Sequence, residues 1–459
     1  MNSNCNDNCQ RIIELTARIK ELEEKNGLLK YELLEMQTKY FGNSKRKKLA
    51  QNTEEEKPKE KKKLGAPVGH TGWFRKKPEK IDVIEEVRLK KCPHCGNEEL
   101  GDCQDIEEHV QEDIILPKLK VTKYLKHSYW CNKCKKVVSG KGREELPRSY
   151  IGPQAKSVAG FLKYIVKVSD RDIKKIFKEL CGLTIVSSSI PGFNNQSRRK
   201  CLPVYEGLKS ELKKAPYVHA DETGCPVDGQ NWWDWVFATT NICLHIIHES
   251  RGARVVEEIL GKKYDGILLS DFFCAYNKLP ARAKQRCLVH LLREIKKILE
   301  CYTQEDSGYT YCQKLKELIQ TAIKLSEKYN ENKISEEKFM EKREYLNETL
   351  GDFQFPDSQK GLIKRLAKRL SRHKNEIFTF LDYKGLPYHN NFAEQLIRLS
   401  VLFRKITFGH RSKNGTLNHS ILMSVLQTGK LNNKESIPLI KNILTCRDNN
   451  PSFKMCLSP

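Results

Sequence analysis

The sequence predicts a multidomain α/β protein with an N-terminal coiled coil, a small zinc-binding β module and a core interrupted by a large helical insertion. Three observations lead to this prediction. A seven-residue apolar repeat occupies the N-terminus, two Cys-x-x-Cys pairs follow it, and short apolar strands mix with helical segments in the centre. With 459 residues the chain is also too long for one ordinary domain.

The centre of the chain carries the α/β signal. Four short apolar runs predict strands, at residues 217–220, 235–238, 244–247 and 266–269. Residues 253–260 predict a helix before the fourth strand. The segment 291–381 is charged, leucine-spaced and almost free of glycine, which predicts a helical block inserted into the core. Earlier helices within 150–215 form either a helix-turn-helix that binds DNA or a packed subdomain.

Residues 9–40 carry a seven-residue repeat that predicts a parallel two-stranded coiled coil. One core position holds Ile12, Ile19, Asn26 and Leu33, and the other holds Leu15, Leu22, Leu29 and Met36. A lone Asn26 in such a core pairs with its symmetry mate and fixes the register. The alternative is an amphipathic helix that packs on its own chain. We favour self-association through this helix.

The charge of the chain indicates a polyanionic partner. Lysine and arginine total 82 against 58 acidic residues, a formal charge of +24. Residues 41–63 form a basic, apolar-poor linker in which Lys45, Arg46, Lys47 and Lys48 would neutralise DNA phosphates. No run approaches the roughly 20 apolar residues of a membrane span, so we expect a cytoplasmic protein.

Two cysteine pairs predict structural zinc. Cys92 and Cys95 form one Cys-x-x-Cys knuckle, and Cys131 and Cys134 form the second. Four thiolates make a closed tetrahedral set that suits Zn²⁺, and the reducing cytosol argues against disulfides. The 35 intervening residues exceed the usual spacing of about 15–20, so a small β insertion should separate the knuckles.

Three acidic residues are candidates for catalysis by divalent ions. Asp221 and Asp271 are each expected directly after a strand, at the rim of the sheet where α/β folds bind ligands. Glu394 is expected in the first turn of a helix that Asn390 or Asn391 caps. Three converging carboxylates repel one another unless a cation such as Mg²⁺ or Mn²⁺ neutralises them. No spacing rule alone joins these three residues.

Four motifs surround these carboxylates: His219-x-Asp221-Glu222-Thr223, Ser270-Asp271-x-x-x-Ala275-Tyr276, Cys287-x-x-His290 and Asn390-Asn391-x-Ala393-Glu394. Upstream, the heptad helix runs into Phe41-Gly42, and a glycine-rich segment spans 65–72 before the cysteine pairs. In all of these features the chain resembles the insertion sequence 66 family of transposases, along nearly its whole length. The resemblance implies an RNase H-like catalytic core in which Asp221, Asp271 and Glu394 form a DDE triad.

The resemblance also implies the activity. A DDE transposase would hold two Mg²⁺ or Mn²⁺ ions, cleave double-stranded DNA at the ends of its element and join the freed 3′-hydroxyl to target DNA. We expect a homodimer or higher assembly on DNA, with accessory proteins of the same element. The family resemblance further implies a bacterial protein that associates with the nucleoid when bound to DNA. The alternative is a non-catalytic, zinc-containing DNA-binding protein, an inactivated or domesticated relative.

Several further residues follow from the motifs. After Glu394 the family runs arginine, one or two apolar residues, then arginine; here Gln395 replaces the first arginine. The cations expected to bind DNA are Arg398, Arg404 and Lys405. His290 is expected near the active site, and Cys287-x-x-His290 as half a metal site is the less favoured interpretation. The tryptophans 232, 233 and 235 would stack on DNA bases or fill the core, and their alternation favours the core.

The expected organisation has eight parts. They are a coiled-coil helix (1–40), a basic and Gly-rich linker (41–87), a zinc module (88–140), a helical DNA-binding subdomain (141–215), the first part of the core (216–290), the helical insertion (291–381), the last part of the core with Glu394 (382–430) and a C-terminal helix and tail (431–459).

Overall fold

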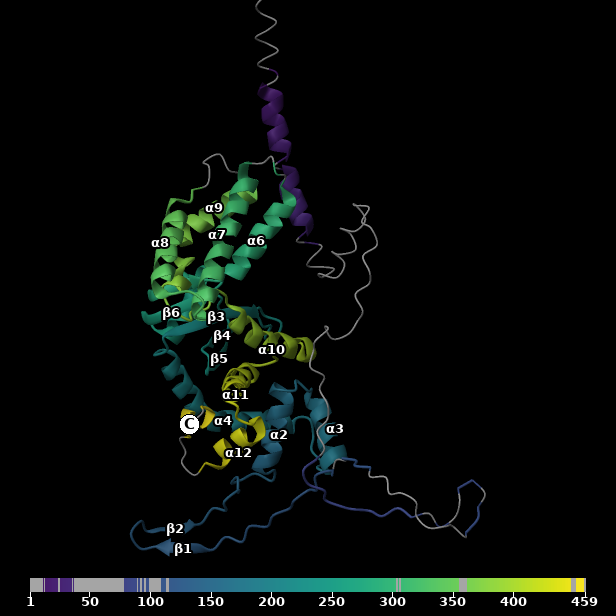
Figure 1. Ribbon diagram of the computed structural model, residues 1–459. Helices are drawn as coiled ribbons and strands as arrows, with labels where there is room; N and C mark the ends of the chain where they lie inside the picture. Colours follow the sequence, from purple (N-terminus) through teal and green to yellow (C-terminus); the bar gives the residue numbers. More distant parts are fainter. Residues whose placement is uncertain are drawn as a thin grey trace, which may run out of the picture. The chain divides into compact units, whose positions relative to one another are not determined.

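A computed structural model of the chain describes residues 11, 13–23, 25–34, 36, 78–88, 90, 93–94, 96–98, 109–112, 115–302, 304, 307–354, 361–446 and 451–457. The chain divides into two units, one made of Met1–Gly42 with Leu119–Pro459 and the other of Asn43–Lys118. The elements described below belong to the first unit (Figure 1). The linker cations Lys45, Arg46, Lys47 and Lys48 lie outside the described residues.

A five-stranded mixed sheet forms the centre of this unit. Its strands are β3 (Tyr217–Gly224), β4 (Trp233–Ala238), β5 (Cys243–His248), β6 (Tyr264–Ser270) and β7 (Ala281–Arg286). They lie in the order β5-β4-β3-β6-β7, with the first three antiparallel and β3, β6 and β7 parallel. Helix α5 (Ala253–Leu260) connects β5 to β6. The mixed α/β fold predicted from the sequence is therefore confirmed.

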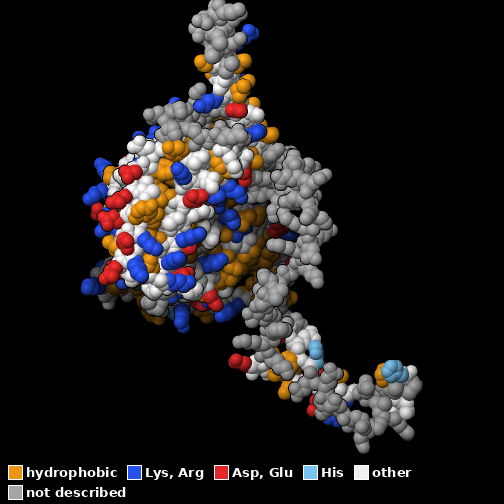
Figure 2. Space-filling view, turned by 45° about the horizontal axis from the view of Figure 1, so that its top comes forward, with side chains coloured by type: hydrophobic (Ala, Val, Ile, Leu, Met, Phe, Trp, Pro, Cys, Tyr) orange, Lys and Arg blue, Asp and Glu red, His pale blue; other side chains and the backbone are white. Residues whose placement is uncertain are grey.

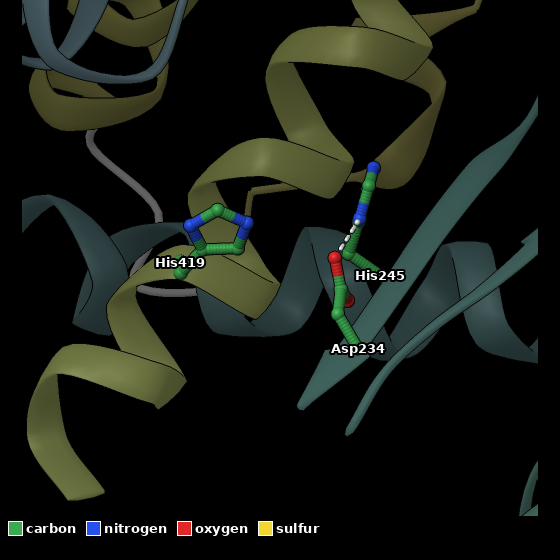
Figure 3. A group of neighbouring side chains, drawn as sticks. All are labelled: Asp234, His245 and His419. Atoms are coloured by element: carbon green, nitrogen blue, oxygen red, sulfur yellow. Dashed lines mark hydrogen bonds and ion pairs between the residues drawn. The ribbon is translucent and has the colours of Figure 1, made fainter. Parts of the chain in front are cut away.

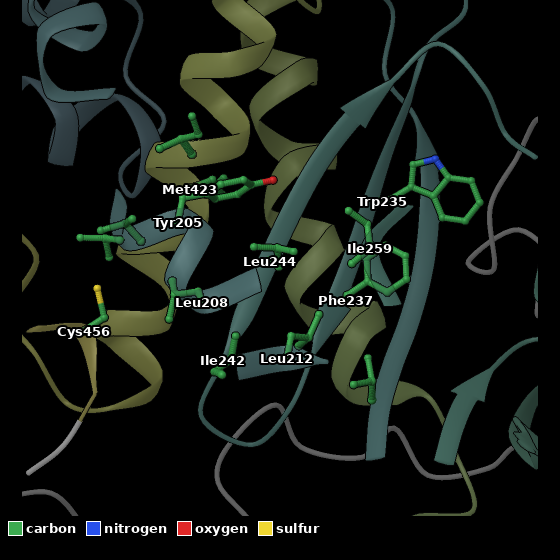
Figure 4. Close-up of a cluster of buried hydrophobic side chains, with 14 of the residues drawn as sticks. Tyr205, Leu208, Leu212, Trp235, Phe237, Ile242, Leu244, Ile259, Met423 and Cys456 are labelled. Carbon is green, nitrogen blue, oxygen red and sulfur yellow. The ribbon is translucent and has the colours of Figure 1, made fainter. Parts of the chain in front are cut away.

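Helices from both ends of the core sequence pack with the sheet in one buried cluster, namely α2 (Pro153–Tyr164), α4 (Ser189–Leu212), α11 (Lys413–Leu431) and α12 (Ser436–Thr445). Helix α3 (Asp170–Cys181) packs on α2 and α4 in a separate cluster. Tyr205, Leu208 and Leu212 of α4 face Phe237 and Leu244 of the sheet in one buried cluster (Figure 4). Burying side chains of this size supplies the main favourable term in folding. The short η4 (Phe453–Cys456) closes this cluster through Cys456.

A block of helices separates β7 from the last core helix, α10 (Asn391–Thr407). It contains α6 (Leu288–Cys301), α7 (Ser307–Asn330), α8 (Glu336–Asp352) and α9 (Gly361–His373), followed by the short η2 (Lys374–Glu376) and η3 (Thr379–Leu381). Leu315, Ile319 and Ala322 of α7 are buried in its own apolar cluster, at the helical spacing seen in the sequence. Every described helix is too short or too polar to span a lipid bilayer.

The N-terminal helix, described at 11, 13–23, 25–34 and 36, has two different apolar faces. Leu28 and Tyr31 pack against the apolar cluster of the helical block, and Lys297 of α6 lies 5.8 Å from the Tyr31 ring. The heptad positions face away, and Figure 2 shows hydrophobic side chains along the outside of this helix. Leu15, Ile19, Leu22, Leu29, Leu33 and Met36 are 52–57% exposed. One face therefore packs against the rest of the chain, while the apolar residues at the heptad positions, here called the heptad stripe, stay exposed to solvent.

Hydroxyl groups of α11 cover the outer edge of the sheet. The backbone N–H groups of Cys243, His245 and Ile247 on edge strand β5 donate to the hydroxyls of Thr428, Ser424 and Ser420, at 3.0, 2.7 and 3.0 Å. Strand residues two apart thus meet helix residues four apart, because 6.6 Å along a strand roughly matches the 6 Å rise of four helical residues. The helix replaces a sixth strand and closes an edge that would otherwise pair with other chains.

We expect Ser424→Ala to lower the free energy of unfolding by about 1–3 kcal/mol, because it leaves the buried N–H of His245 without its acceptor. Ser210→Ala is the matched control, since Ser210 is exposed on α4 and its loss should change stability by less than about 0.5 kcal/mol. Urea unfolding of both variants measures the difference. Equal stability of the two variants would contradict this account of the sheet edge.

Candidate active site

Asp221 and Asp271 meet at the ends of two adjacent parallel strands. Strand β3 pairs with β6 in the register Tyr217↔Ile267 to His219↔Leu269, and the same register continued by two residues sets Asp221 opposite Asp271. Adjacent strands lie about 4.8 Å apart. Asp271 follows β6 directly, as expected, but Asp221 lies within β3 rather than after it. The reason is that β3 continues to Gly224 by pairing with β4 alone.

Glu394 reaches this edge because Asn390 fixes the start of α10 against β3. The Asn390 side-chain amide donates to the Ala220 carbonyl at 2.8 Å, and its Oδ1 lies 3.0 Å from His219 Nδ1. Asn390 stands at the N-cap position, but its side chain bonds β3 instead of capping the helix. Burial lowers the pKa of His219 to about 4, so this imidazole is neutral. Sequence reasoning treated His219 as part of a motif and Asn390 as a candidate helix cap, and it did not predict this junction.

The three carboxylates influence one another electrostatically. Burial, followed by the negative charge of the adjacent Glu222, raises the pKa of Asp221 to about 8. The charges of Asp271 and Glu394 add to this rise. Backbone N–H groups hold two of the three, since Glu222 N donates to Asp221 Oδ1 and Phe273 N donates to Asp271 Oδ1. The arrangement concentrates negative charge that a cation would neutralise.

Glu222 has a different environment from Asp221, although the two are adjacent. Arg251 donates to Glu222 Oε1 at 2.8 Å, and the Tyr276 hydroxyl donates to Oε2 at 2.5 Å. The guanidinium of Arg251 lies 4.5 Å from the Trp233 ring and 4.1 Å from the Phe273 ring. These contacts join β3 to the turn after Asp271. Glu222 is therefore committed to a structural ion pair, which the sequence did not reveal.

His290 lies beside Glu394, as expected from the sequence. His290 Nδ1 and Glu394 Oε1 are 3.6 Å apart, and within the described residues neither atom has a hydrogen-bond partner. Cys287 Sγ lies in the same group but is buried and accepts the backbone N–H of Asn390 at 3.2 Å. Burial raises the pKa of Cys287, which keeps it a neutral thiol. Cys287 therefore contributes to the junction with Asn390, and its Sγ also lies within 4.8 Å of ligand atoms of His290 and Glu394.

The carboxylate chemistry of these residues suits a divalent cation. Within the described residues, however, the group of ligand atoms around Glu394 that lie within 4.8 Å of one another joins Glu394 to Cys287 and His290 and does not include the two aspartates. Glu394 Oε1 is a buried carboxylate oxygen without a hydrogen-bond partner among the described residues, and Asp221 is protonated near neutral pH unless positive charge is supplied. Mg²⁺ and Mn²⁺ prefer such carboxylate oxygens. A bound cation would compensate the negative charge that is buried here.

The remaining predicted DNA-binding cations lie along α10. Arg398 is exposed one turn beyond Glu394, on the same side of the helix. Arg404 Nη1 donates to Thr223 Oγ1 at 3.3 Å, which places its guanidinium near the end of β3. Lys405 is exposed. The α10 cations thus lie along the helix on the C-terminal side of Glu394.

The second cysteine knuckle forms the turn of a hairpin, β1 (Ser128–Cys131) and β2 (Lys136–Ser139). Cys134 N donates to Cys131 Sγ at 3.4 Å. This bond, with further help from the Cys134 side chain and the Lys133 backbone, lowers the pKa of Cys131 and favours the thiolate that binds metal. Cys92 and Cys95 lie outside the described residues.

Family comparison identifies two matched regions of the chain. Residues 148–417, more than half of the chain, match the model of the Transposase IS66 family. The chain belongs to the IS66 family of transposases. Residues 89–135 match the zinc-finger binding domain of transposase IS66, which contains all four predicted cysteine ligands and supports zinc as a cofactor. The matched core contains Asp221, Asp271 and Glu394.

One curated relative also matches this IS66-family chain. The uncharacterized protein y4jO of Sinorhizobium fredii is 32% identical over 68 residues. The match covers 15% of this chain and 21% of that protein. Because the shared segment is so short and the relative is uncharacterized, the functional evidence comes from the family match and from the geometry.

A second polar group of the transposase is buried away from the carboxylates. Figure 3 shows Asp234 of β4, His245 of β5 and His419 of α11. Asp234 Oδ2 lies 3.2 Å from His245 Nδ1, and Ser400 Oγ of α10 lies 2.9 Å from His419 Nε2. Burial favours a neutral imidazole, but the Cys243 and Asp234 side chains outweigh it and raise the pKa of His245 to about 10. The group therefore contains a buried ion pair that joins the sheet to its covering helices.

This ion pair predicts a pH dependence of stability. A His245 pKa raised from 6.5 to about 10 stabilises the fold fully below pH 6.5, and that contribution is lost as pH rises toward 10. We therefore expect wild type to exceed His245→Gln in unfolding free energy by more at about pH 7 than at about pH 9.5. Urea unfolding at both pH values measures the gap, and a gap that does not shrink would show that His245 is not charged in the folded state.

Proposed function

We propose that the chain is an active DDE transposase that cleaves the ends of its element and joins them to target DNA. The observation that carries this proposal is the convergence of Asp221, Asp271 and Glu394, three carboxylates separated by up to 173 residues in sequence, at one edge of the sheet. Repulsion between these carboxylates does not stabilise the fold. Binding a divalent ion would explain why they are placed together.

In this proposal each side chain has a distinct role. Asp221, Asp271 and Glu394 hold Mg²⁺ or Mn²⁺, which when bound would supply activation of water and stabilisation of the leaving oxygen. The position of His290, 3.6 Å from Glu394 Oε1, suits it to orient that carboxylate or a nearby phosphate. Arg398, one turn along α10, would contact a DNA phosphate.

We further propose that the sheet is an RNase H-like core. Counted from β3, its strand order is 3-2-1-4-5, with an antiparallel meander followed by two parallel strands. This is the strand arrangement of RNase H-like folds, and it sets the first strand, which carries Asp221, next to the fourth, which precedes Asp271. Helices α6–α9 form the insertion before the helix that carries Glu394.

The DNA path in this proposal includes the helical segment 141–215. A cleft of about 950 Å³ lies between α2–α4 and the turn from α10 to α11. Lys163, Arg171, Lys175 and Arg411 line it, with Asp170 and Asp172 pairing with the two lysines. Arg171 and Arg411 add positive charge that suits a phosphate backbone. The zinc module and the basic linker would extend this contact.

Assembly is proposed to involve the open heptad stripe of the N-terminal helix. The exposed leucine, isoleucine and methionine side chains at the heptad positions form the apolar seam that a parallel coiled coil buries. The opposite face packs on the helical block, so pairing two such helices would also bring two catalytic cores together. Cleavage of two element ends requires such a pair.

We expect Asp221→Asn, Asp271→Asn and Glu394→Gln each to lower the rate of DNA cleavage and strand transfer by orders of magnitude, because each nearly isosteric change removes charge from the metal site. Binding to DNA should persist, since it depends on cations elsewhere. The substrate is a duplex carrying an end of the encoding element, in Mg²⁺ or Mn²⁺.

Asp265→Asn is the matched control. Asp265 lies on β6, the strand that leads to Asp271, but it is exposed and forms a surface ion pair with Lys263. This variant should retain wild-type cleavage. If the wild type bound these ends but never cut them, the alternative of a non-catalytic DNA-binding relative would replace the proposal. If Glu394→Gln cut normally, Glu394 would not be the third ligand.

A further inference from the structure

Phe408, at the end of α10, combines strong exposure with an unfavourable backbone conformation. Its side chain is 90% exposed. Its φ of +58° lies in the left-handed region that residues other than Gly, Asn and Asp rarely adopt. Glycine is the usual residue at this position after a helix. An exposed phenylalanine there gains little from burial, so its presence points to a function.

The surrounding backbone holds Phe408 in this conformation. His410 N donates to the Pro226 carbonyl at 2.9 Å, and Asp228 N donates to the His410 carbonyl at 2.7 Å. Gly409 lets the two segments approach, because a Cβ there would lie 2.5 Å from the Pro226 oxygen. The turn after α10 is thus fastened to the β3–β4 turn. The backbone that carries Phe408 is therefore held in place.

Phe408 borders a small pocket whose chemistry is aromatic and cationic. The pocket has a volume of about 370 Å³, and its lining includes Trp232, Trp233, Arg404 and Lys405. No carboxylate lines it among the described residues. Trp232 and Trp233 are half-buried, whereas Trp235 is fully buried in the core. The sequence-based expectation that the tryptophans fill the core holds for Trp235, and Trp232 and Trp233 each pack against a buried cluster while also lining this pocket.

The pocket lies close to the candidate active site. Its lining includes Gly224, three residues beyond Asp221 on the same strand and therefore about 10 Å away. That distance corresponds to about three stacked base steps of DNA, at 3.4 Å each. Arg404, which donates to Thr223, bridges the pocket and this strand.

We propose that this pocket receives a single unpaired DNA base near the cleavage point, stacked on Phe408 and the Trp232–Trp233 wall, with Arg404 and Lys405 on the adjoining phosphates. The inference deepens the proposed action on DNA and depends on it for the ligand class. A paired base offers only its edges, so a stacking site requires a base outside the duplex. Aromatic platforms beside cations suit such bases whatever their sequence, because every base has a π face.

The test compares binding of the full chain to two DNA duplexes of the same arbitrary sequence, one fully paired and one with a single bulged adenine. Fluorescence anisotropy without added divalent ion measures both dissociation constants, so no cleavage occurs. Wild type should prefer the bulged duplex. Phe408→Gly should reduce that preference by about tenfold, within the range expected for loss of one stacked base, and Phe408→Trp should preserve it.

Two features make the result specific. Phe408→Gly suits the positive φ, so this variant should fold at least as stably as wild type, and a lost preference cannot be assigned to misfolding. Leu402→Ala is the matched control, since Leu402 is 42% exposed on the same helix and outside the pocket; it should keep the preference. A wild type that binds both duplexes equally, or Phe408→Gly that retains the preference, overturns the proposal. The assay contains no divalent ion and measures binding alone, so its outcome is distinguishable from failure of the cleavage proposal.

Discussion

The buried side chain of Asn390 is the constraint on which the candidate active site depends. Its amide bonds β3 at His219 and Ala220, and its backbone N–H donates to Cys287 at the start of α6. Three distant segments of the chain therefore meet at one residue. Because Asn390 also accepts the backbone N–H of Glu394 at 3.2 Å, the same residue determines where that carboxylate lies.

The rest of the core is organised by buried polar groups that satisfy one another. Hydroxyls of α11 cover the β5 edge, and the buried Arg286 of β7 pairs with Glu376 at 2.6 Å on the opposite side of the sheet. Glu376 also contacts His373 at 2.8 Å. Glu376 is thus already neutralised, whereas Glu394 Oε1 has no hydrogen-bond partner among the described residues. This contrast favours Glu394 over another helical acid as the third carboxylate.

Sequence reasoning predicted the elements whose local pattern is strong. Helix 253–260 and the four apolar strands were found, because their composition and spacing carry the signal. Strand β7 was missed, since Ala281–Arg286 alternates small and charged residues, and the contacts that let Arg286 be buried, with Glu376, Asn277 and the Asp271 carbonyl, have no local signal. The Asn390 junction and the exposed Phe408 also have no local signal, because both are defined by contacts with residues more than 100 positions away. The family motifs identified Asp221, Asp271 and Glu394. The register of β3 with β6 and the Asn390 junction explain how these residues come near one another.

The central claim is that Asp221, Asp271 and Glu394 share a divalent ion. Iron-mediated backbone cleavage tests it most directly, because Fe²⁺ in place of Mg²⁺ generates radicals that cut the chain near the bound ion, without any DNA. The account predicts cuts clustered near residues 221, 271 and 394 in wild type, competed by Mn²⁺ and absent in Asp221→Asn. Any cuts at the cysteine knuckles should remain in that variant. Cuts confined to other segments, or unchanged by Asp221→Asn, would contradict the account.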